Sequence, residues 1–405
     1  MNILILCKKF PYPLKEGEPI ATAYLSRALA AKGCKVSLLV LNTSKHYFDP
    51  KLLPEKDNHY HQIYSVEINN DITITGALKC LIQKRSYILS RFISKNYASK
   101  LQSVLKSGSF DIVQLETIYM SHYIPFIREV SDAIIALRTH NVEHKIWEGV
   151  AANMGYLKKW YLNLQIKYLK RFELAVINDC DVLVAITEND LNNFKKSGLK
   201  KEGLAIPVGF NTKEYETDFK PDSSNQSIAF IGALDWMPNQ HGVVWFLEKV
   251  WPLVHAAFPN MEFHIAGKNT PDWIKQKVSA KVIIHGEVPD AKSFIKQHPV
   301  LIAPLFSGSG IKIKILEGLA LGRAVITTST GIEGIPAIHE QHLFIANNEQ
   351  EFFHAIHHCF SPETDILKLR QSGRSLLYNK FDSDLLSTKI LATYQRFLAE
   401  KLIVL

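Results

Sequence analysis

Short apolar runs of strand length alternate with helix-length spacers, and this alternation constrains the fold more than any other feature. The first run is Asn2–Cys7, and Val36–Leu41 follows after a helix expected from about Ile20 to Lys32. A strand, a helix and a strand in succession predict a βαβ unit, and therefore a parallel sheet. Further strands are expected at Asp111–Leu115, Ala133–Leu137 and Val182–Ile186.

The alternation begins again after Lys195–Ser227, a polar segment rich in turn residues that is typical of an interdomain linker. A long helix is expected over Gly242–Phe258, and a closing helix over 382–405. The strands of this second set are expected at Ile228–Ile231, Phe263–Ala266, Val282–His285, Val300–Leu305 and Ala324–Thr328. We therefore expect two doubly wound α/β domains, 1–203 and 204–381, with the ligand in a cleft at the carboxyl ends of the strands.

Composition fits this size and class. A chain of 405 residues with 47% hydrophobic and 21% charged residues is expected to form two globular domains. The longest apolar runs reach about eight residues, and charge returns at Lys8 and Lys9, so we expect no membrane-spanning helix and no signal peptide. We therefore expect a cytoplasmic location. The cysteines lack paired spacing, and we expect them to be reduced: Cys7, Cys34, Cys80, Cys180 and Cys359.

Positive charge is concentrated in the first half of the chain. Residues 1–200 carry 27 Lys and Arg against 18 Asp and Glu, whereas residues 201–405 carry 20 against 21. One domain is therefore expected to meet an anionic surface or substrate. The basic residues fall on no recognisable nucleic-acid motif, so no nucleic acid is expected as a partner. The segment Trp147–Asn178 combines lysines and aromatic residues on a helical pattern. Such a helix could contact an anionic membrane peripherally. Alternatively, it is a packed helix whose lysines are solvated.

The most informative loop is Ser307–Glu317, which joins an apolar strand to a helix. Gly308, Ser309 and Gly310 leave backbone N–H groups directed at one spot, and the dipole of the following helix favours an anion there. Lys312 and Lys314 add cations, and Glu317 follows Lys314 by three residues, so both can project from one helix face. The pattern predicts a site for a nucleotide sugar, although a plain turn and a solvated glutamate would look the same.

Other candidates also follow strands. Gly17 lies after the first strand, and His140 follows Ala133–Leu137, where it could donate to a phosphate or a sugar hydroxyl or only cap a helix. Lys268 is a candidate diphosphate contact or an ordinary surface lysine, and the backbone around Val288 could hold the base.

His140-Asn141-Val142-Glu143-His144 also matches an inverted zinc-peptidase motif. Because that chemistry needs both histidines on one helix face and a third ligand, and this motif directly follows a strand, no metal and no other cofactor is expected.

With these residues in view, the chain resembles the retaining GT-B glycosyltransferases of family 4, the group 1 glycosyltransferases of bacterial polysaccharide synthesis. The resemblance runs through nearly the whole chain and rests on these stretches: Phe10-Pro11-Tyr12-Pro13, Asn141–His144, Gly232–Asn239, Gly308–Gly322 and Gly331–Gly334. It implies the GT-B fold, two Rossmann-like domains, and transfer with retention of anomeric configuration.

The resemblance also implies roles for individual residues. His140 is similar to the active-site histidine near the transferred sugar, Gly17 to the loop that approaches the diphosphate, and Glu317 to the carboxylate on the donor ribose. The phosphate-side cations would be Lys268, Lys312 and Lys314. Where the family often has a further glutamate, this chain has Ser309, whose backbone N–H can still serve with that of Gly310.

The expected function is transfer of a sugar from a nucleotide diphosphate sugar donor to a hydroxyl acceptor, a saccharide or lipid-linked saccharide, in the synthesis of a cell-surface polysaccharide or glycolipid. One alternative keeps the fold but is a nucleotide-sugar epimerase, which needs no acceptor. Another is a protein that binds a nucleotide sugar without turnover.

Overall fold

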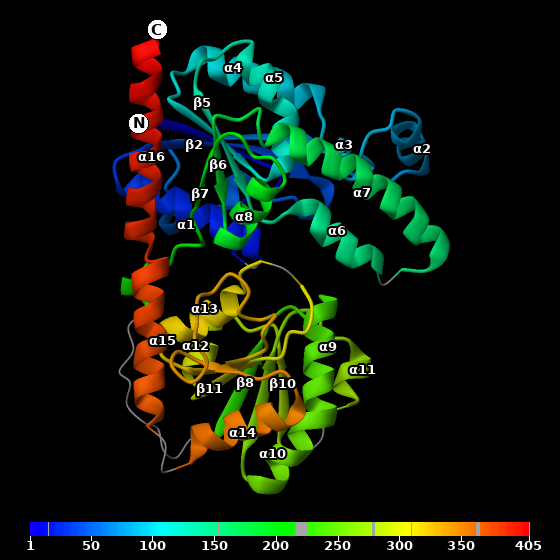
Figure 1. Ribbon diagram of the computed structural model, residues 1–405, viewed down its shortest axis with the longest axis vertical. Coiled ribbons are helices and arrows are strands. Elements are labelled where there is room, and N and C mark those ends of the chain that lie inside the picture. The colour runs from blue at the N-terminus through cyan, green and yellow to red at the C-terminus, as the bar shows by residue number, and fades with distance from the viewer. Residues whose placement is uncertain are drawn as a thin grey trace. The chain divides into compact units, whose positions relative to one another are not determined.

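The computed structural model describes residues 1–14, 16–152, 154–215, 226–277, 280–308, 310–361 and 365–404. The chain divides into two compact units, Met1–Phe210 with Ser383–Leu405, and Asn211–Asp382. Each unit contains one parallel sheet flanked by helices (Figure 1). The α/β class and the two doubly wound domains are therefore confirmed.

The sheet of the first unit has the strand order β3-β2-β1-β4-β5-β6-β7. Its strands are β1 (Asn2–Cys7), β2 (Lys35–Thr43), β3 (Gln62–Ile68), β4 (Ile112–Glu116), β5 (Ile134–Thr139), β6 (Val182–Ala185) and β7 (Glu202–Ala205). Ile3 and Ile5 pack into the core on one face, whereas Leu4 and Leu6 pack into the core on the other. Burial on both faces explains why the first strand reads as a continuous apolar run.

The first unit also contains the last helix of the chain, α16 (Ser383–Val404). It lies beside α1 (Gly17–Ala31), and its Leu386, Ile390 and Tyr394 join the core that contains Ile3 and Ile5 (Figure 1). The other helices of this unit are α2 (Ile74–Ile82), α3 (Tyr87–Ser90), α4 (Lys95–Ser107), α5 (Ile124–Arg128), α6 (Glu143–Ala152), α7 (Tyr156–Val176) and α8 (Glu188–Lys196).

The sheet of the second unit has the order β10-β9-β8-β11-β12-β13, again with parallel pairing. Its strands are β8 (Ser227–Ile231), β9 (Glu262–Ala266), β10 (Val282–Gly286), β11 (Val300–Ala303), β12 (Ala324–Thr327) and β13 (Phe344–Ile345). Its helices are α9 (Met237–Trp245), α10 (Trp251–Ala257), α11 (Asp272–Lys275), α12 (Ala291–Lys296), α13 (Ile313–Ala320), α14 (Glu349–Phe360) and α15 (Ile366–Phe381).

Strand order reverses once in each sheet, between β1 and β4 and between β8 and β11. At such a reversal the connections leave toward opposite faces of the sheet, so the carboxyl ends of the two central strands stay uncovered. In open parallel sheets, ligands commonly bind at such a reversal.

Some predicted boundaries are wrong. A domain boundary at 203/204 would cut β7, which pairs with β6 along Val182–Ala185, and the first unit continues to Phe210. The expected linker Lys195–Ser227 therefore contains a strand of the first sheet. Like β7, the edge strands β3 and β13 were not predicted; β3 alternates between exposed and half-buried residues, and β13 has two residues.

The second unit differs in two further places. The strand expected over Val300–Leu305 ends at Ala303, which leaves Pro304 and Leu305 in the ligand-side loop. The helix expected over Gly242–Phe258 begins earlier, at Met237, and runs through α9, a π-helical segment Phe246–Val250 and α10. Among the described residues, no helix is long and apolar enough to cross a membrane.

Gly242 offers a test of how closely α9 packs on the loop after β11. A Cβ atom at this position would lie 1.9 Å from the carbonyl oxygen of Pro304, so Gly242→Ala should lower the free energy of unfolding by about 2–3 kcal/mol. Gly149→Ala in α6 is the matched control, because nothing lies within 4 Å of its Cβ position and alanine favours a helix. Thermal unfolding measures both; equal melting temperatures for the two variants would contradict the packing.

Candidate active site

The carboxyl edge of the first sheet holds a buried acid, Glu116, the last residue of β4. Its Oε2 lies 2.5 Å from Nε2 of His140 and 3.3 Å from a guanidinium nitrogen of Arg138. Its Oε1 accepts a hydrogen bond from Nε2 of Gln114 at 2.5 Å. Since β4 and β5 are neighbouring parallel strands, the pairing places the end of one beside the end of the other.

The contact with Glu116 determines which ring nitrogen of His140 carries the proton. Burial alone would raise the pKa of Glu116, but the Arg138 charge and the hydrogen bonds from His140 and Gln114 outweigh it and hold that pKa at about 2. An ionised carboxylate can only accept, so Nε2 of His140 carries the proton and Nδ1 is the nitrogen left for a ligand.

The same network reaches the C-terminal helix. The Tyr394 hydroxyl on α16 donates to Oε1 of Gln114 at 2.7 Å, which orients the Gln114 amide so that its nitrogen meets Glu116. Both Gln114 and Glu116 are fully buried. A residue near the end of the chain thus helps to fix the orientation of His140.

Gly17 begins α1 between two paired carboxylates. Lys9 lies 2.6 Å from Glu16, and Lys8 lies 3.0 Å from Glu18. Burial would raise the pKa of Glu18, but Lys8 and Lys9 lower it below its ordinary value. Among the described residues, nothing lies within 4 Å of the Cβ position of Gly17.

The two histidines of the zinc-peptidase motif contact different carboxylates. His140 contacts Glu116, whereas Nδ1 of His144 lies 2.5 Å from Glu173 of α7. Glu173 also accepts from the backbone N–H of Glu143 at 2.7 Å, so it caps the first turn of α6. Within the described ranges, no three His, Cys, Asp or Glu side chains are arranged to hold a metal ion.

In the second unit, Lys314 lies at the reversal of strand order between β8 and β11. Its ammonium donates to Oδ1 of Asn239 at 2.9 Å and lies 4.4 Å from the centre of the Phe230 ring. A Cβ atom at Gly232 would come within 2.4 Å of that ammonium, so a larger residue there would have to displace the end of the Lys314 side chain. Asn239 is held in turn by donating to the carbonyl of Ala233 at 2.8 Å.

The loop before α13 turns on two glycines. Gly308 and Gly310 have φ angles of +99° and +78°, which glycine adopts without strain, and Ser309 lies outside the described residues. Lys312 folds back on this loop and donates to the carbonyls of Gly308 and Gly310, and it lies 3.9 Å from Glu333. The side chain of the N-cap residue Lys312 makes no capping hydrogen bond, and first-turn N–H groups that lack such a cap can bind an anion.

Two side chains of α13 have displaced pKa values. Burial lowers the pKa of Lys314 to about 7, with a further lowering from Lys312 and an opposing effect of Glu317. Burial raises the pKa of Glu317 to about 7, and nearby Lys292 and Lys314 counteract it in part. No described residue forms a hydrogen bond with the Glu317 carboxylate. Two poorly compensated charges one turn apart at a strand-order reversal are typical of a functional site.

Lys268 and Val288 belong to loops at the same carboxyl edge, after β9 and β10. Backbone hydrogen bonds join these loops: the N–H of Gly267 donates to Gly286, and the N–H of Leu234 donates to Lys268. The structure thus brings Lys268, Val288, Gly310, Lys312, Lys314 and Glu317 to one edge of the second sheet, and His140 and Gly17 to the corresponding edge of the first.

Sequence reasoning missed Glu116 and Asn239. A signal for the first was present, because Gln114 and Glu116 are polar residues in an otherwise apolar strand, where a buried network is the common explanation. Asn239 gave no such signal, since its contact with Lys314 joins residues 75 positions apart.

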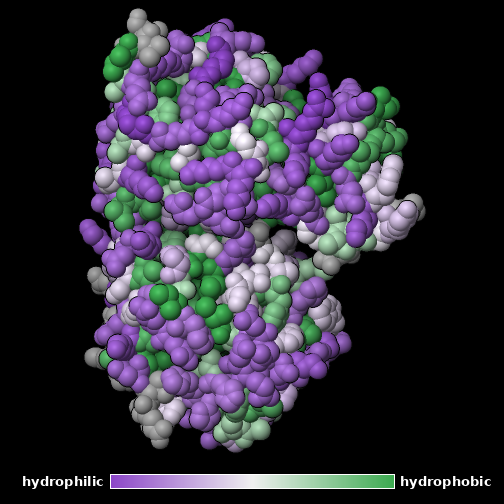
Figure 2. All heavy atoms as spheres, viewed as in Figure 1, coloured by the Kyte–Doolittle hydropathy of each residue, from purple (hydrophilic) through white to green (hydrophobic). Residues whose placement is uncertain are grey.

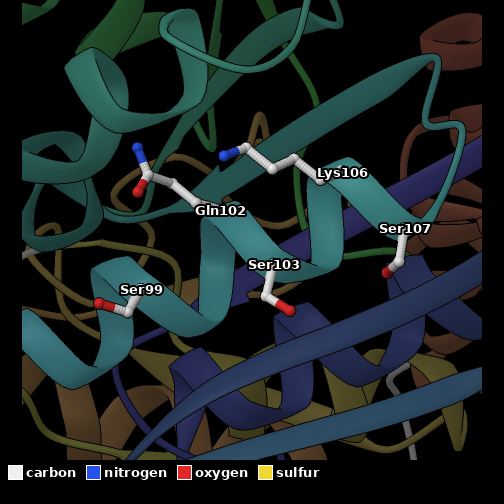
Figure 3. A pocket seen from close by; sticks show the side chains of 5 residues that line it. All are labelled: Ser99, Gln102, Ser103, Lys106 and Ser107. Atoms are coloured by element: carbon white, nitrogen blue, oxygen red, sulfur yellow. The ribbon is translucent and has the colours of Figure 1, made fainter.

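A separate hollow of about 460 Å³ lies on α4 and is lined by Ser99, Gln102, Ser103, Lys106 and Ser107 (Figure 3). Gln102 and Lys106 extend to the same side of the helix, and the Gln102 amide donates to Glu129 at 2.7 Å. Its lining offers hydroxyls, an amide and one lysine, a set without an acid–base pair, and we assign it no role.

Comparison with known proteins identifies the second unit. Residues 225–361 match the family model described as "Glycosyl transferases group 1". The second unit is therefore similar to the group 1 glycosyl transferases. The whole transferase is 22% identical over 397 residues to an uncharacterized 44.6 kDa protein in the cps region of Klebsiella pneumoniae, covering 94% of this chain and 97% of that one.

Solved structures share the fold over the full length of the transferase. Sucrose-phosphate synthase from Thermosynechococcus elongatus matches with a TM-score of 0.71 and 14% identity, covering 99% of this chain and 100% of that chain. HepE of Anabaena, crystallised in complex with UDP, matches with a TM-score of 0.69 and 12% identity, covering 98% and 100%. These likenesses establish the GT-B fold.

The buried network of the transferase predicts an asymmetric response to mutation. Glu116→Gln leaves the fully buried Arg138 without its counter-charge and should lower the free energy of unfolding by about 3–5 kcal/mol. Tyr394→Phe removes one neutral hydrogen bond and should cost about 1–2 kcal/mol. Denaturant unfolding measures both; a larger loss in Tyr394→Phe would contradict the assigned ionisation of Glu116.

Proposed function

We propose that this transferase moves a sugar from a nucleoside diphosphate sugar to a hydroxyl acceptor with retention of anomeric configuration. The observation that carries the proposal is the pair Lys314 and Glu317, which lies beside an uncapped helix entrance at a strand-order reversal. A pyrophosphate joined to a ribose carries negative charge and hydroxyl donors, which a cation and a carboxylate can bind respectively. The resemblance to retaining GT-B enzymes supports retention.

The second unit would hold the donor. The diphosphate would bind the backbone N–H groups of Ser309, Gly310 and the first turn of α13, with Lys314 moving its ammonium from Asn239 to a phosphate oxygen. Lys312 would support the loop from within, since it already spans the carbonyls of Gly308 and Gly310.

The remaining donor contacts would come from Glu317 and the neighbouring loops. Glu317 would accept hydrogen bonds from the ribose hydroxyls, since its buried carboxylate has no hydrogen-bond partner among the described residues. Lys268 would be a further diphosphate-side cation, and backbone groups around Val288 would hold the base.

The first unit would supply His140 to the reaction. With Nε2 engaged by Glu116, Nδ1 is the atom that would meet the transferred sugar or its phosphate. Gly17 would let the entrance of α1 approach the diphosphate, because no side chain fills that space. Donors fixed in place before reaction stabilise the leaving diphosphate as its charge develops, which is the main electrostatic contribution expected here.

The pathway is proposed from the relative in the Klebsiella pneumoniae cps region, which supports a role in cell-surface polysaccharide or glycolipid synthesis. The acceptor would be a saccharide or a lipid-linked saccharide. The transferase would act in the cytoplasm, with peripheral contact to an anionic membrane through the basic, aromatic face of α7. The HepE structures in complex with UDP and with UDP-glucose support the choice of a nucleoside diphosphate donor.

A panel of nucleotides and nucleoside diphosphate sugars, read by thermal shift, tests donor binding. Purified transferase should then release nucleoside diphosphate only when an acceptor is present, and the product anomer should match that of the donor. Release of nucleoside diphosphate, or epimerisation of the sugar, without an acceptor would favour an epimerase. Donor binding without any turnover would favour a protein that binds a nucleotide sugar but has no catalytic activity.

Variants at the two proposed catalytic residues should separate binding from chemistry. Glu317→Ala removes a charged hydrogen-bond acceptor for the donor and should weaken donor affinity about 10-fold to 100-fold. His140→Ala should reduce kcat about 100-fold and leave donor affinity nearly unchanged. Glu248→Ala, which removes an exposed carboxylate paired with Lys277, is the control. Unchanged donor affinity in Glu317→Ala would remove that residue from the site.

Donor affinity should also depend on pH with a maximum near neutrality. Above pH 7 Lys314 loses its proton and its charge, and below pH 7 Glu317 gains a proton and loses its charge, so affinity should fall on both sides. Lys314→Arg should abolish the alkaline fall and Glu317→Gln the acidic one. Titration calorimetry with a nucleoside diphosphate sugar, whose phosphates do not titrate in this range, measures the profile; a flat profile would contradict it.

A further inference from the structure

Helix α2 exposes an apolar face that no described part of the first unit covers. Ile74 and Ile82 are 81% and 82% exposed, and Leu78 between them is also exposed. Their spacing of four residues places the three side chains in one stripe along the helix, and exposed Ile72 directly precedes it. Figure 2 shows this apolar cluster at the edge of the first unit where Figure 1 places α2.

The opposite side of α2 is fixed to the body of the unit. Thr73 caps the helix by accepting from the N–H of Gly76 at 3.2 Å, and its own N–H donates to the Tyr87 hydroxyl at 2.7 Å. The N–H of Tyr87 donates to Gln165 of α7 at 2.6 Å. Through Tyr87, α2 is joined to α7, so the apolar stripe is held on a fixed support and is not a frayed end.

Helix α7 adds aromatic side chains with polar edges. Tyr156 and Trp160, four residues apart, are exposed, Trp160 to 61%. By spacing, exposed Lys159 shares a helix face with Tyr156, three residues before it, and exposed Lys167 shares one with Trp160, seven residues before it. Tyrosine and tryptophan with lysine beside them are the side chains that favour the boundary between water and lipid.

Charge around these two helices has one sign. Residues 72–110 contain seven Lys and Arg and no Asp or Glu, and residues 149–172 contain five and none. The cations are Lys79, Lys84, Arg85, Arg91, Lys95, Lys100, Lys106, Lys158, Lys159, Lys167, Lys170 and Arg171. The nearest acid along the sequence is Asp71, which accepts a hydrogen bond from Ser44 at 3.2 Å.

We propose that α2 and α7 together form a docking surface for an anionic lipid bilayer. Ile74, Leu78 and Ile82 enter the acyl boundary, Tyr156 and Trp160 lie at the headgroup level, and the lysines contact acidic headgroups. Helix α2 is about 14 Å long, less than half the hydrocarbon core of about 30 Å. It therefore lies in the surface of the bilayer.

Charge favours a bilayer over the other possible occupants. The sequence segments that contain α2 and α7 carry cations and no acid, so a second copy of the chain would bring like charge against like charge at these helices, which repels. An apolar stripe on a segment that is rich in cations combines the two signals, hydrophobic and electrostatic, that stable attachment to an anionic membrane requires. The surface would bring the first unit to a lipid-linked acceptor, and to that extent it rests on the proposed function.

Vesicle sedimentation with the full chain, without donor or acceptor, tests the docking surface. Binding to phosphatidylcholine vesicles with about one third phosphatidylglycerol should be at least about 10-fold stronger than to phosphatidylcholine alone, and should weaken with salt. Combined Ile74→Asn, Leu78→Asn and Ile82→Asn should reduce binding to the anionic vesicles about 10-fold or more. Lys158→Gln with Lys159→Gln should reduce it and flatten its salt dependence.

Leu52→Asn is the matched control, because Leu52 is 69% exposed, lies in the same unit and is outside the proposed surface. Melting temperatures of all variants verify folding. Equal binding of the triple variant and the parent, or no preference for anionic vesicles, would overturn the proposal, as would an apolar stripe found to join two copies in solution. Because no sugar transfer is measured, failure here leaves the glycosyl transfer unaffected, and loss of turnover leaves the docking intact.

Discussion

A single constraint organises both units: in each parallel sheet the strand order reverses once, and the carboxyl ends on either side of the reversal stay uncovered. In the first sheet this places the end of β4 next to the loop after β5, and so Glu116 next to His140. In the second it places the loop after β8 next to the start of α13, and so Gly232 and Asn239 next to Lys314. Each of these contacts joins residues distant in the chain, and none would form without the parallel order of strands.

The carboxyl edges of the two sheets differ in how their buried charges are compensated. At the first, Glu116 is fully buried but has Arg138, His140 and Gln114 as partners, so its charge is retained and its pKa is low. At the second, Lys314 has one neutral amide and an aromatic ring, and Glu317 has no hydrogen-bond partner among the described residues, so both pKa values move toward neutrality. A compensated charge serves to position a neighbour, whereas an uncompensated one is available to a ligand. The contrast separates a residue that fixes His140 from residues that would hold the donor.

The sequence predicted the parts of the fold that are buried on both sides. Runs such as Asn2–Cys7 are apolar throughout because both faces of the sheet are covered, and they were placed to within one residue or two. Edge strand β3 was missed because only one side of it is partly covered, so its apolar residues alternate with exposed ones. The boundary at 203/204 was misplaced because β7 lies in a segment whose glycines and prolines resemble a linker.

For the site, the sequence predicted what lies along one loop and could not predict what lies across strands. Gly308, Gly310, Lys314 and Glu317 are local to one strand–helix connection, so their pattern was readable. Glu116 and Asn239 act on residues 24 and 75 positions away, through contacts that only strand order creates. The exposure of the apolar stripe of α2 could not be predicted from the sequence either, since the apolar face of a helix is normally covered by its own domain.

The most direct measurement is a crystal structure of the full chain with a bound nucleoside diphosphate. The phosphates should lie within hydrogen-bonding distance of the first-turn N–H groups of α13 and of the Lys314 ammonium, with the ribose hydroxyls on Glu317. A nucleotide bound elsewhere, with Lys314 still donating to Asn239 and the Glu317 carboxylate without a ligand, would contradict the placement of the donor at this helix.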